Sequence, residues 1–408
     1  MNRICLLMMV SVLLWHCGPT PQSTGPQWVK LNADQMPAFK DNDSPQAMVR
    51  AINRQLEWLA GPGADKSWSF GEETVSAKRM ISTLTVFREH WLHSGSDSNT
   101  LREKILLDFD VYRIQWNQSP DFLITGYHAP VLEGSLTRTE RFKYPLYRIP
   151  DDAFFIRPAK FRESLMRPGT SPRHNKAMAR IDPQTNEATP YFTREEIDGQ
   201  GVLQGKGLEL VWLDDYFESF LFHVQGGGFV QLQDGSYVKL NYAGKNDHPY
   251  ISIGRLLVDE GKIPEADISI QAIKKYFAAN PNEVTRVCYA NKSYVFYQLS
   301  GSGSSEITPD LYPHGVLDFP VTPRRSIATD KAWFPGGALM FIEGQQRIES
   351  GQPQAFSLFA IDQDTGGAIT ENHIDLFQGA GPQAETDAGL LKDHQGKVYM
   401  LLIKENRS

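Results

Sequence analysis

Residues 362–381 read DQDTGGAITENHIDLFQGAG, and this stretch says more about fold and chemistry than any other part of the chain. Asp364 precedes two glycines, where a protein backbone can approach a ligand closely. Asp375 has apolar residues on both sides, and such surroundings disfavour the charged form of a carboxyl group. Because a carboxylic acid that stays protonated near neutral pH can protonate a leaving oxygen, Asp375 is our candidate general acid.

Other kinds of site fit the sequence less well. The triplet Asp-Thr-Gly at 364–366 is also typical of a turn, and aspartic proteases need two such carboxylates where this chain has one triplet. The sequence lacks His-Glu-x-x-His, Cys-x-x-Cys and Gly-x-Ser-x-Gly, so we expect no metal, no cofactor and no nucleophilic serine. Three glycines at 226–228 lack the Lys-Ser/Thr of a phosphate loop and indicate a bulge or a close backbone approach.

Strand patterns dominate the chain from Phe122 onward. Apolar residues alternate on both sides of Asp234-Gly235 within 230–242, which predicts a β-hairpin because glycine tolerates the positive φ of a tight turn. Residues 315–403 are again typical of β-structure. The pattern favours a mainly β protein, built from barrel-like domains with peripheral helices.

Three segments carry apolar residues at helical spacing and predict helices: 44–60, 101–114 and 269–279. Two others predict irregular structure. Residues 300–305 are all serine or glycine and indicate a flexible join, and the proline- and arginine-rich segment 151–186 indicates a long loop or an insertion.

The first residues have the pattern of an export signal. Arg3 precedes an apolar run, 4–15, that is too short to span a membrane and ends at Cys17. A polar, proline-rich segment follows at 18–27 and predicts a flexible tether. We therefore expect a signal peptide of the lipoprotein type at 1–17, lipidation of Cys17 and a periplasmic protein anchored to the outer membrane.

The composition excludes some partners. The 408-residue chain has a formal net charge of -7 and no basic runs, which argues against nucleic acid as the main partner. Cys288 is the single cysteine after position 17, so no internal disulfide is expected in the folded part. Its apolar neighbours indicate a small buried side chain and not a nucleophile.

Several motifs together resemble one family. The sequence TGYHAP at 125–130 resembles the Thr-Gly-Tyr-Tyr-x-Pro signature of the membrane-bound lytic murein transglycosylase A family. Asp330, Asp364 and Asp375 resemble the three-aspartate pattern of its C-terminal 3D domain. The resemblance runs in collinear order from 122 to 404 and includes the segments YPLY at 144–147, VQGGG at 224–228, YAGKNDHPY at 242–250, SIGR at 252–255 and NKSYVF at 291–296.

The resemblance implies a fold and its division into domains. A double-psi β-barrel domain with N-terminal helices would comprise 28–121 and 298–408. A smaller β-barrel, 122–297, would be inserted into it, with a groove between the two. The substrate implied is peptidoglycan, cut without water between N-acetylmuramic acid and N-acetylglucosamine to leave a 1,6-anhydro ring, a lyase reaction.

The resemblance also implies roles for individual residues. Asp375 would act first as general acid and then as base, and Asp364 would support it or contact sugar. The C6 hydroxyl of the substrate itself would attack, in place of the second carboxylate that hydrolysing glycosidases need. The remaining implied supporting and substrate-binding residues are Asp330, Thr125, Tyr127, Gln225, Gly226 and Gly367.

Three residues depart from the family pattern. His128 replaces a usual tyrosine, Gly227 a usual serine and Asp247 a usual glycine, so the fine specificity for substrate is in doubt more than the reaction type. Two alternatives stay open. One is a peptidoglycan-binding lipoprotein without catalysis, and the other is a glycoside hydrolase that uses water and a second carboxylate, Glu133 or Asp330.

Overall fold

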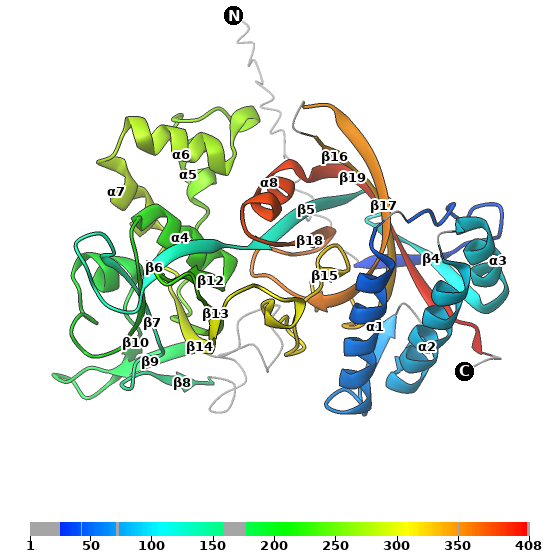
Figure 1. Ribbon diagram of the computed structural model, residues 1–408, viewed down its shortest axis with the longest axis horizontal. Helices are drawn as coiled ribbons and strands as arrows, with labels where there is room; N and C mark the ends of the chain where they lie inside the picture. The colour runs from blue at the N-terminus through cyan, green and yellow to red at the C-terminus, as the bar shows by residue number, and fades with distance from the viewer. Residues whose placement is uncertain are drawn as a thin grey trace, which may run out of the picture.

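The computed structural model describes residues 25–41, 43–70, 73–95, 97–157, 177–348 and 351–405. Two β-rich halves lie side by side, one built around β16–β19 and the other around β6–β14, with β5 running between them (Figure 1). The expected signal peptide, the lipidation site Cys17 and most of the tether lie outside the described residues. Within the described ranges, no helix is both long and apolar enough to cross a membrane.

The larger half is organised by an eight-stranded sheet. Its order is β1 (Pro26–Lys30), β4 (Phe109–Trp116), β19 (Lys392–Ile403), β16 (Leu339–Arg347), β17 (Pro353–Asp364), β15 (Ser326–Ala328), β18 (His373–Ala380) and β5 (Phe122–Ala129). β19 also pairs with β5, so the strands from β19 to β5 close into a six-stranded barrel. The β5–β18 and β15–β17 pairs are parallel, which fixes the register on which the site depends.

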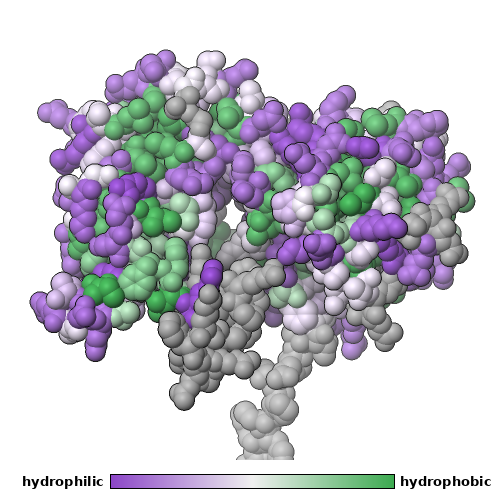
Figure 2. Space-filling view, turned by 90° about the horizontal axis from the view of Figure 1, so that it is seen from below, coloured by the Kyte–Doolittle hydropathy of each residue, from purple (hydrophilic) through white to green (hydrophobic). Residues whose placement is uncertain are grey.

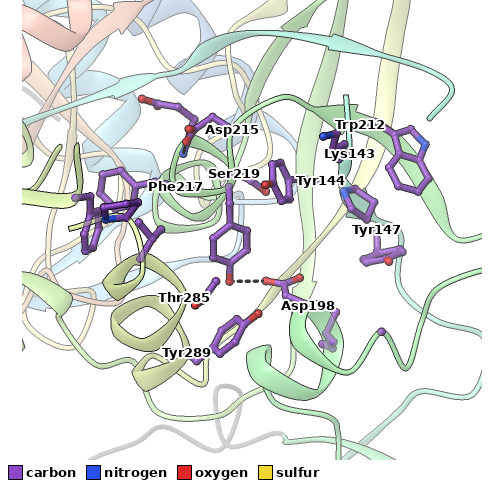
Figure 3. Close-up of a pocket in the computed structure, with 18 of the residues that line it drawn as sticks. Lys143, Tyr144, Tyr147, Asp198, Trp212, Asp215, Phe217, Ser219, Thr285 and Tyr289 are labelled. Atoms are coloured by element: carbon purple, nitrogen blue, oxygen red, sulfur yellow. Dashed lines mark hydrogen bonds between the residues drawn. The ribbon is translucent and has the colours of Figure 1, made fainter. Parts of the chain in front are cut away.

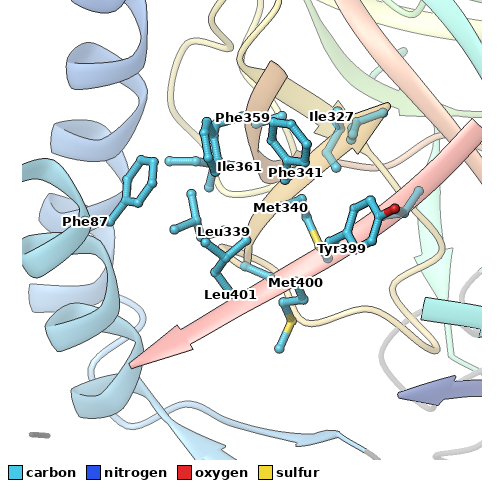
Figure 4. Close-up of a cluster of buried hydrophobic side chains, with 14 of the residues drawn as sticks. Phe87, Ile327, Leu339, Met340, Phe341, Phe359, Ile361, Tyr399, Met400 and Leu401 are labelled. Atoms are coloured by element: carbon cyan, nitrogen blue, oxygen red, sulfur yellow. The ribbon is translucent and has the colours of Figure 1, made fainter. Parts of the chain in front are cut away.

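Helices cover the barrel on its outer side. They are α1 (Pro45–Ala60), α2 (Ala77–Ser94) and α3 (Ser98–Asp108), with α8 (Pro382–Leu390) beside β5 and β18, and β2 (Ser67–Phe70) and β3 (Glu73–Ser76) form a hairpin between α1 and α2. α1 fills the helix expected at 44–60 and begins where the Ser44 side chain accepts a hydrogen bond from the Ala47 N–H. Phe87 of α2 packs on Phe359 of β17, with ring centroids 4.8 Å apart (Figure 4). This aromatic contact ties the helices to the barrel.

The smaller half contains a six-stranded sheet in the order β14 (Val295–Ser304), β13 (Tyr237–Lys245), β12 (Gly228–Gln231), β6 (Val131–Ser135), β11 (Glu209–Leu213) and β7 (Tyr144–Tyr147). A separate three-stranded sheet contains β8 (Phe154–Ile156), β9 (Ala177–Ile181) and β10 (Ala188–Pro190). The helices of this half are α4 (Tyr216–Gln225), α5 (Ile253–Asp259), α6 (Ile270–Ala279) and α7 (Glu283–Ala290). Shorter turns occur at η3 (Glu195–Gly199), η4 (Glu265–Asp267) and η5 (Pro309–Leu311).

Several local predictions are confirmed. β12 and β13 form the expected hairpin, and Gly235 has the positive φ of 84° that its turn requires. α6 spans the helix expected at 269–279 and is capped by Ser269. Close backbone approach explains Gly228, since a Cβ there would lie 2.6 Å from the Pro130 carbonyl oxygen. Cys288 is fully buried in an apolar cluster.

Other local predictions are wrong. The helix expected at 101–114 ends at Asp108, because β4 starts at Phe109 and alternates its buried residues against β1 and β19. Residues 300–305 are not a free join, since β14 extends to Ser304 and pairs with β13 there. The segment 151–186 contains β8 and β9 and is not simply a loop, although 158–176 lie outside the described residues. Residues 315–403 include a helix, α8.

The fold is mainly β with peripheral helices, as expected. One strand is placed differently from the expectation. β5, which we assigned to the inserted domain, pairs with β18 and β19 of the larger barrel and then continues through Pro130 toward β6. β5 therefore belongs to the larger barrel and leads from it into the smaller half, and its position brings Thr125 and Tyr127 into the barrel wall beside the C-terminal aspartates.

Candidate active site

One row of residues crosses four neighbouring strands of the barrel. Thr125 on β5 pairs with Asp375 on β18, Asp375 pairs with Ala328 on β15, and Ala328 pairs with Asp364 on β17. The two aspartates predicted to matter thus come together through strand register, although they lie on strands separated by β15.

Asp375 is held by a short chain of hydrogen bonds. The Thr125 hydroxyl donates to Asp375 Oδ1 at 2.7 Å and lies 2.8 Å from His373 Nε2. His373 Nδ1 is 3.4 Å from the Ala368 carbonyl oxygen. A hydroxyl has one proton and two acceptor lone pairs, so Thr125 can donate to an ionised Asp375 or accept from a protonated one. The chain can therefore accompany Asp375 through both protonation states.

The pKa of Asp375 suits a group that acts both as general acid and as general base. The pKa of Asp375 is raised to about 7, chiefly because the carboxyl group is buried; the hydrogen bond from Thr125 lowers this pKa, and the negative charge of Asp364 raises it. Burial also lowers the pKa of His373, so its ring is neutral at pH 7. A carboxylic acid with a pKa near 7 is half protonated at neutral pH, which suits proton transfer in either direction.

Asp364 is anchored more rigidly than Asp375. Tyr127 donates its phenolic proton to Asp364 Oδ2 at 2.7 Å, and the backbone N–H groups of Val316 and Thr365 donate to Oδ1 at 3.2 and 2.8 Å. Burial raises the pKa of Asp364, and these three donors oppose the rise. With its oxygens already bound to Tyr127 and to the backbone, Asp364 is placed to influence Asp375 electrostatically.

Asp330 and Gly367 lie on loops around this row. Asp330 accepts backbone hydrogen bonds from Ala332 at 3.0 Å and Glu371 at 3.1 Å, so it ties the loop after β15 to the loop that leads into His373. Gly367 is exposed, and no protein atom lies within 4 Å of the place a Cβ would take. The structure therefore gives Asp330 a role in loop geometry and leaves open space above Gly367.

A groove of about 300 Å³ lies next to Thr125, between the two halves. Thr125, Gly126 and His128 of β5 line one side, and Leu221 and Gln225 of α4 line another. The start of α6 and residues of α8 complete the walls. Asp375 does not itself line this cavity and is reached through Thr125. Seen from below, an opening separates the two halves of the molecule (Figure 2).

Two glycines shape the walls of this groove. A Cβ on Gly126 would lie 2.8 Å from the Ala388 Cα, so only glycine lets β5 pack against α8. Gly226 ends α4 with a φ of 80°, in the left-handed region that glycine adopts without strain. It follows Gln225 directly, and the turn that it makes fixes the end of α4 at the groove.

The three departures have different surroundings. His128 lines the groove, and burial lowers the pKa of its imidazole. A Cβ on Gly227 would meet the Leu240 carbonyl oxygen at 2.7 Å, so a serine there would require the backbone to shift. Asp247 adopts a φ of 58°, and its carboxylate accepts a hydrogen bond from the Met178 N–H at 2.8 Å, which links its loop to β9.

Sequence reasoning missed two features of the site. His373 is two residues before Asp375, but no motif in the sequence marks it, and only the fold shows its contact with Thr125. The second feature is a cluster in which Lys274 of α6 pairs with Glu218 of α4 at 2.7 Å and with Glu385 of α8 at 3.3 Å. This cluster joins the two halves beside the groove. Its three residues are far apart in the sequence, and no sequence motif around any of them predicts it. Among the described residues, no three His, Cys, Asp or Glu side chains gather as metal ligands would.

The fold and site define a class: mainly β proteins of two halves, with a buried aspartic acid of raised pKa beside the groove between them. Residues 123–298 match the family model of the MltA specific insert domain, and residues 325–402 match that of the 3D domain. The membrane-bound lytic murein transglycosylase A of Vibrio cholerae is 32% identical over 342 residues, which cover 82% of this chain and 79% of that protein. The chain belongs to the membrane-bound lytic murein transglycosylase A family and carries its 3D domain.

Solved structures agree with this assignment. The membrane-bound lytic murein transglycosylase from Agrobacterium tumefaciens superposes with a TM-score of 0.72 at 27% identity, covering 92% of this chain and 97% of that one. Escherichia coli MltA with bound chitohexaose has a TM-score of 0.66 at 24% identity, over 92% of this chain and 93% of the other. At 24% identity, the likeness to the E. coli structure shows a shared fold alone.

Proposed function

We propose that this protein is a lytic transglycosylase that cleaves the β-1,4 bond between N-acetylmuramic acid and N-acetylglucosamine in peptidoglycan. The observation that carries the proposal is Asp375, a carboxyl group with a pKa of about 7 that is hydrogen-bonded to Thr125 at the edge of the groove. The names of the relatives from Vibrio cholerae and Agrobacterium tumefaciens support the same reaction class.

In the proposed mechanism a single carboxyl group acts twice. Protonated Asp375 gives its proton to the glycosidic oxygen as the bond from that oxygen to C1 of the muramic acid breaks, and N-acetylglucosamine leaves as an alcohol. The Asp375 carboxylate then takes the proton of the C6 hydroxyl, whose oxygen forms a new bond to C1 and closes the 1,6-anhydro ring. Asp375 ends protonated, and no water is consumed.

The surroundings of Asp375 suit these two steps. Ionised Asp375 is stabilised by the Thr125 hydroxyl, and charge-assisted hydrogen bonds of this kind are about twice as strong as neutral ones. Asp364 opposes the ionisation of Asp375 through its own negative charge. Thr125 therefore lowers the pKa of Asp375, and Asp364 raises it. We propose that Tyr127 keeps Asp364 in place for this purpose.

We propose that the glycan strand lies along the groove. Thr125, Gln225 and Gly226 would contact sugar from its two sides, and the open space at Gly367 would admit a ring close to the backbone. The E. coli relative was crystallised with chitohexaose, a chain of β-1,4-linked sugars, which supports a groove of this kind. Asp330 would act indirectly, by holding the loop that leads to His373.

Further features of the family are proposals for this chain. We propose that the six-stranded barrel has the double-psi topology, that 28–121 and 298–408 form its domain together with β5, and that the rest of 122–297 forms the inserted barrel. We also propose export to the periplasm and a lipid on Cys17 as an anchor in the outer membrane. The relatives named membrane-bound support association with the cell envelope.

The test compares purified wild type with Asp375→Asn on isolated peptidoglycan, and Asp34→Asn is a matched control at an exposed site. We expect loss of general acid and base catalysis to lower the rate of Asp375→Asn by roughly 10²- to 10⁴-fold. Asp34→Asn should cleave at the wild-type rate. A variant Asp375→Asn with unchanged activity would rule out the proposed role.

A further inference from the structure

A second cavity of about 770 Å³ lies in the smaller half, away from the row of aspartates (Figure 3). Its walls come from β7, α4, α6 and α7, and this volume is in the range of small-molecule and peptide sites. Nothing in the proposed reaction uses it. Its lining combines aromatic rings with charged side chains of both signs.

The cavity adjoins the groove at one ionic cluster. Glu218 lines both cavities, and its partner Lys274 lines the second cavity while reaching Glu385 in the groove. A molecule attached to a sugar in the groove would therefore pass over this cluster to enter the second cavity. This placement favours an occupant that branches from the glycan strand.

The aromatic walls favour a compact occupant over successive sugar rings. Tyr144 and Tyr216 have ring centroids 5.6 Å apart and planes inclined by 53°, and Tyr216 and Tyr289 are 6.1 Å apart at 76°. Rings turned in such different directions offer no flat platform for a row of sugars. Tyr216 already donates its hydroxyl proton to Asp198 at 3.1 Å, the contact drawn in Figure 3, which keeps it fixed.

Two exposed cations that line the cavity have no acidic partner among the described residues. Arg138 and Lys143 both line the cavity and are exposed, and neither forms an ion pair with any residue that the structure describes. Arg138 lies over the Trp212 ring, 6.0 Å from its centroid. By contrast, the neighbouring Arg141 is paired with both Glu133 and Asp214. Unpaired cations beside a cavity suit an occupant that carries carboxylates.

We infer that the second cavity binds the acidic stem peptide that peptidoglycan carries on its muramic acid, with Arg138 and Lys143 contacting its carboxylates. The inference rests on the proposed function, because the peptide reaches the cavity from a strand lying in the groove. It adds a specificity site to the enzyme: strands with peptides would bind more tightly than bare ones.

Two measurements on the full-length protein test this inference. The first is binding of a synthetic stem tetrapeptide, followed by NMR or calorimetry, and the second is cleavage of glycan strands with and without their peptides. The double variant Arg138→Ala/Lys143→Ala should weaken tetrapeptide binding and raise KM for peptide-bearing strands, each by about three- to tenfold. Its kinetics on bare strands should match wild type. Lys40→Ala/Lys78→Ala removes two exposed charges from the larger half and is the control.

The outcomes separate this inference from the proposed function. Tetrapeptide binding that depends on Arg138 and Lys143, in a protein that cleaves nothing, would support the cavity and refute the proposed reaction. Absence of tetrapeptide binding would overturn the inference, whether or not the enzyme is active. An equal loss of activity on both kinds of strand would also overturn it, because the cations would then act on the glycan or on the fold.

Discussion

Replacing Thr125 by valine removes the one side-chain hydroxyl bonded to Asp375 while keeping the shape of the residue. A hydrogen bond to a charged group contributes about 1.5–3 kcal/mol and a neutral one about 0.5–1.5 kcal/mol. The difference, about 1–1.5 kcal/mol, favours the ionised form and equals roughly one pKa unit. Thr125→Val should therefore raise the pKa of Asp375 from about 7 to roughly 8.

The assay is the pH dependence of kcat/KM, which reports the pKa values of the free enzyme. Asp375 must be protonated to start the reaction, so wild-type activity should fall as pH rises through about 7. In Thr125→Val this alkaline limb should move up by about one pH unit. Thr125→Ser keeps the hydroxyl and should leave the limb in place. A limb that stays fixed in Thr125→Val, or moves to lower pH, would refute the assignment of Asp375 as the acid.

Three further predictions follow from the same contacts. The negative charge of Asp364 raises the pKa of Asp375, so Asp364→Asn should move the alkaline limb of kcat/KM to lower pH, opposite to Thr125→Val. The pKa of Asp375 is raised from the ordinary value of 3.8, so its ionisation in the folded protein costs stability that grows as pH rises from about 4 and levels off above about 7. Chemical denaturation should then find Asp375→Asn equal to wild type near pH 4 and more stable near pH 8, by about 4 kcal/mol for a pKa raised by roughly three units; equal stability at both would contradict the shift. Arg325 is fully buried and pairs with Asp41 at 2.5 and 3.0 Å, so Arg325→Met should lower the free energy of unfolding by about 3–5 kcal/mol. A loss below about 1 kcal/mol would show that the pair is dispensable.

Features that depend on local pattern could be predicted from the sequence. The hairpin of β12 and β13, the helices that begin at Ser44 and Ser269 and the apolar setting of Asp375 each follow from a few neighbouring residues. The collinear motifs then indicated the family, which the comparisons show.

Features that depend on distant partners could not be predicted. Residues 300–304 read as a join because serine and glycine have weak strand preference, but pairing with β13 supplies their backbone hydrogen bonds. The buried residues of α8 are two alanines, Ala384 and Ala388. Its sequence therefore lacks the apolar stripe that predicts a helix. His373 contacts Thr125, a residue 248 positions earlier, and only the closed barrel brings the two together.

The central claim is that Asp375 completes the cleavage without water. The most direct test is digestion of purified peptidoglycan in water enriched in ¹⁸O, followed by mass spectrometry of the released fragments. A hydrolase adds one oxygen from solvent at C1, whereas attack by the C6 hydroxyl adds none. We predict unlabelled fragments with 1,6-anhydro ends from wild type and none from Asp375→Asn. Fragments that carry ¹⁸O at a reducing end would contradict the account and require a second carboxylate.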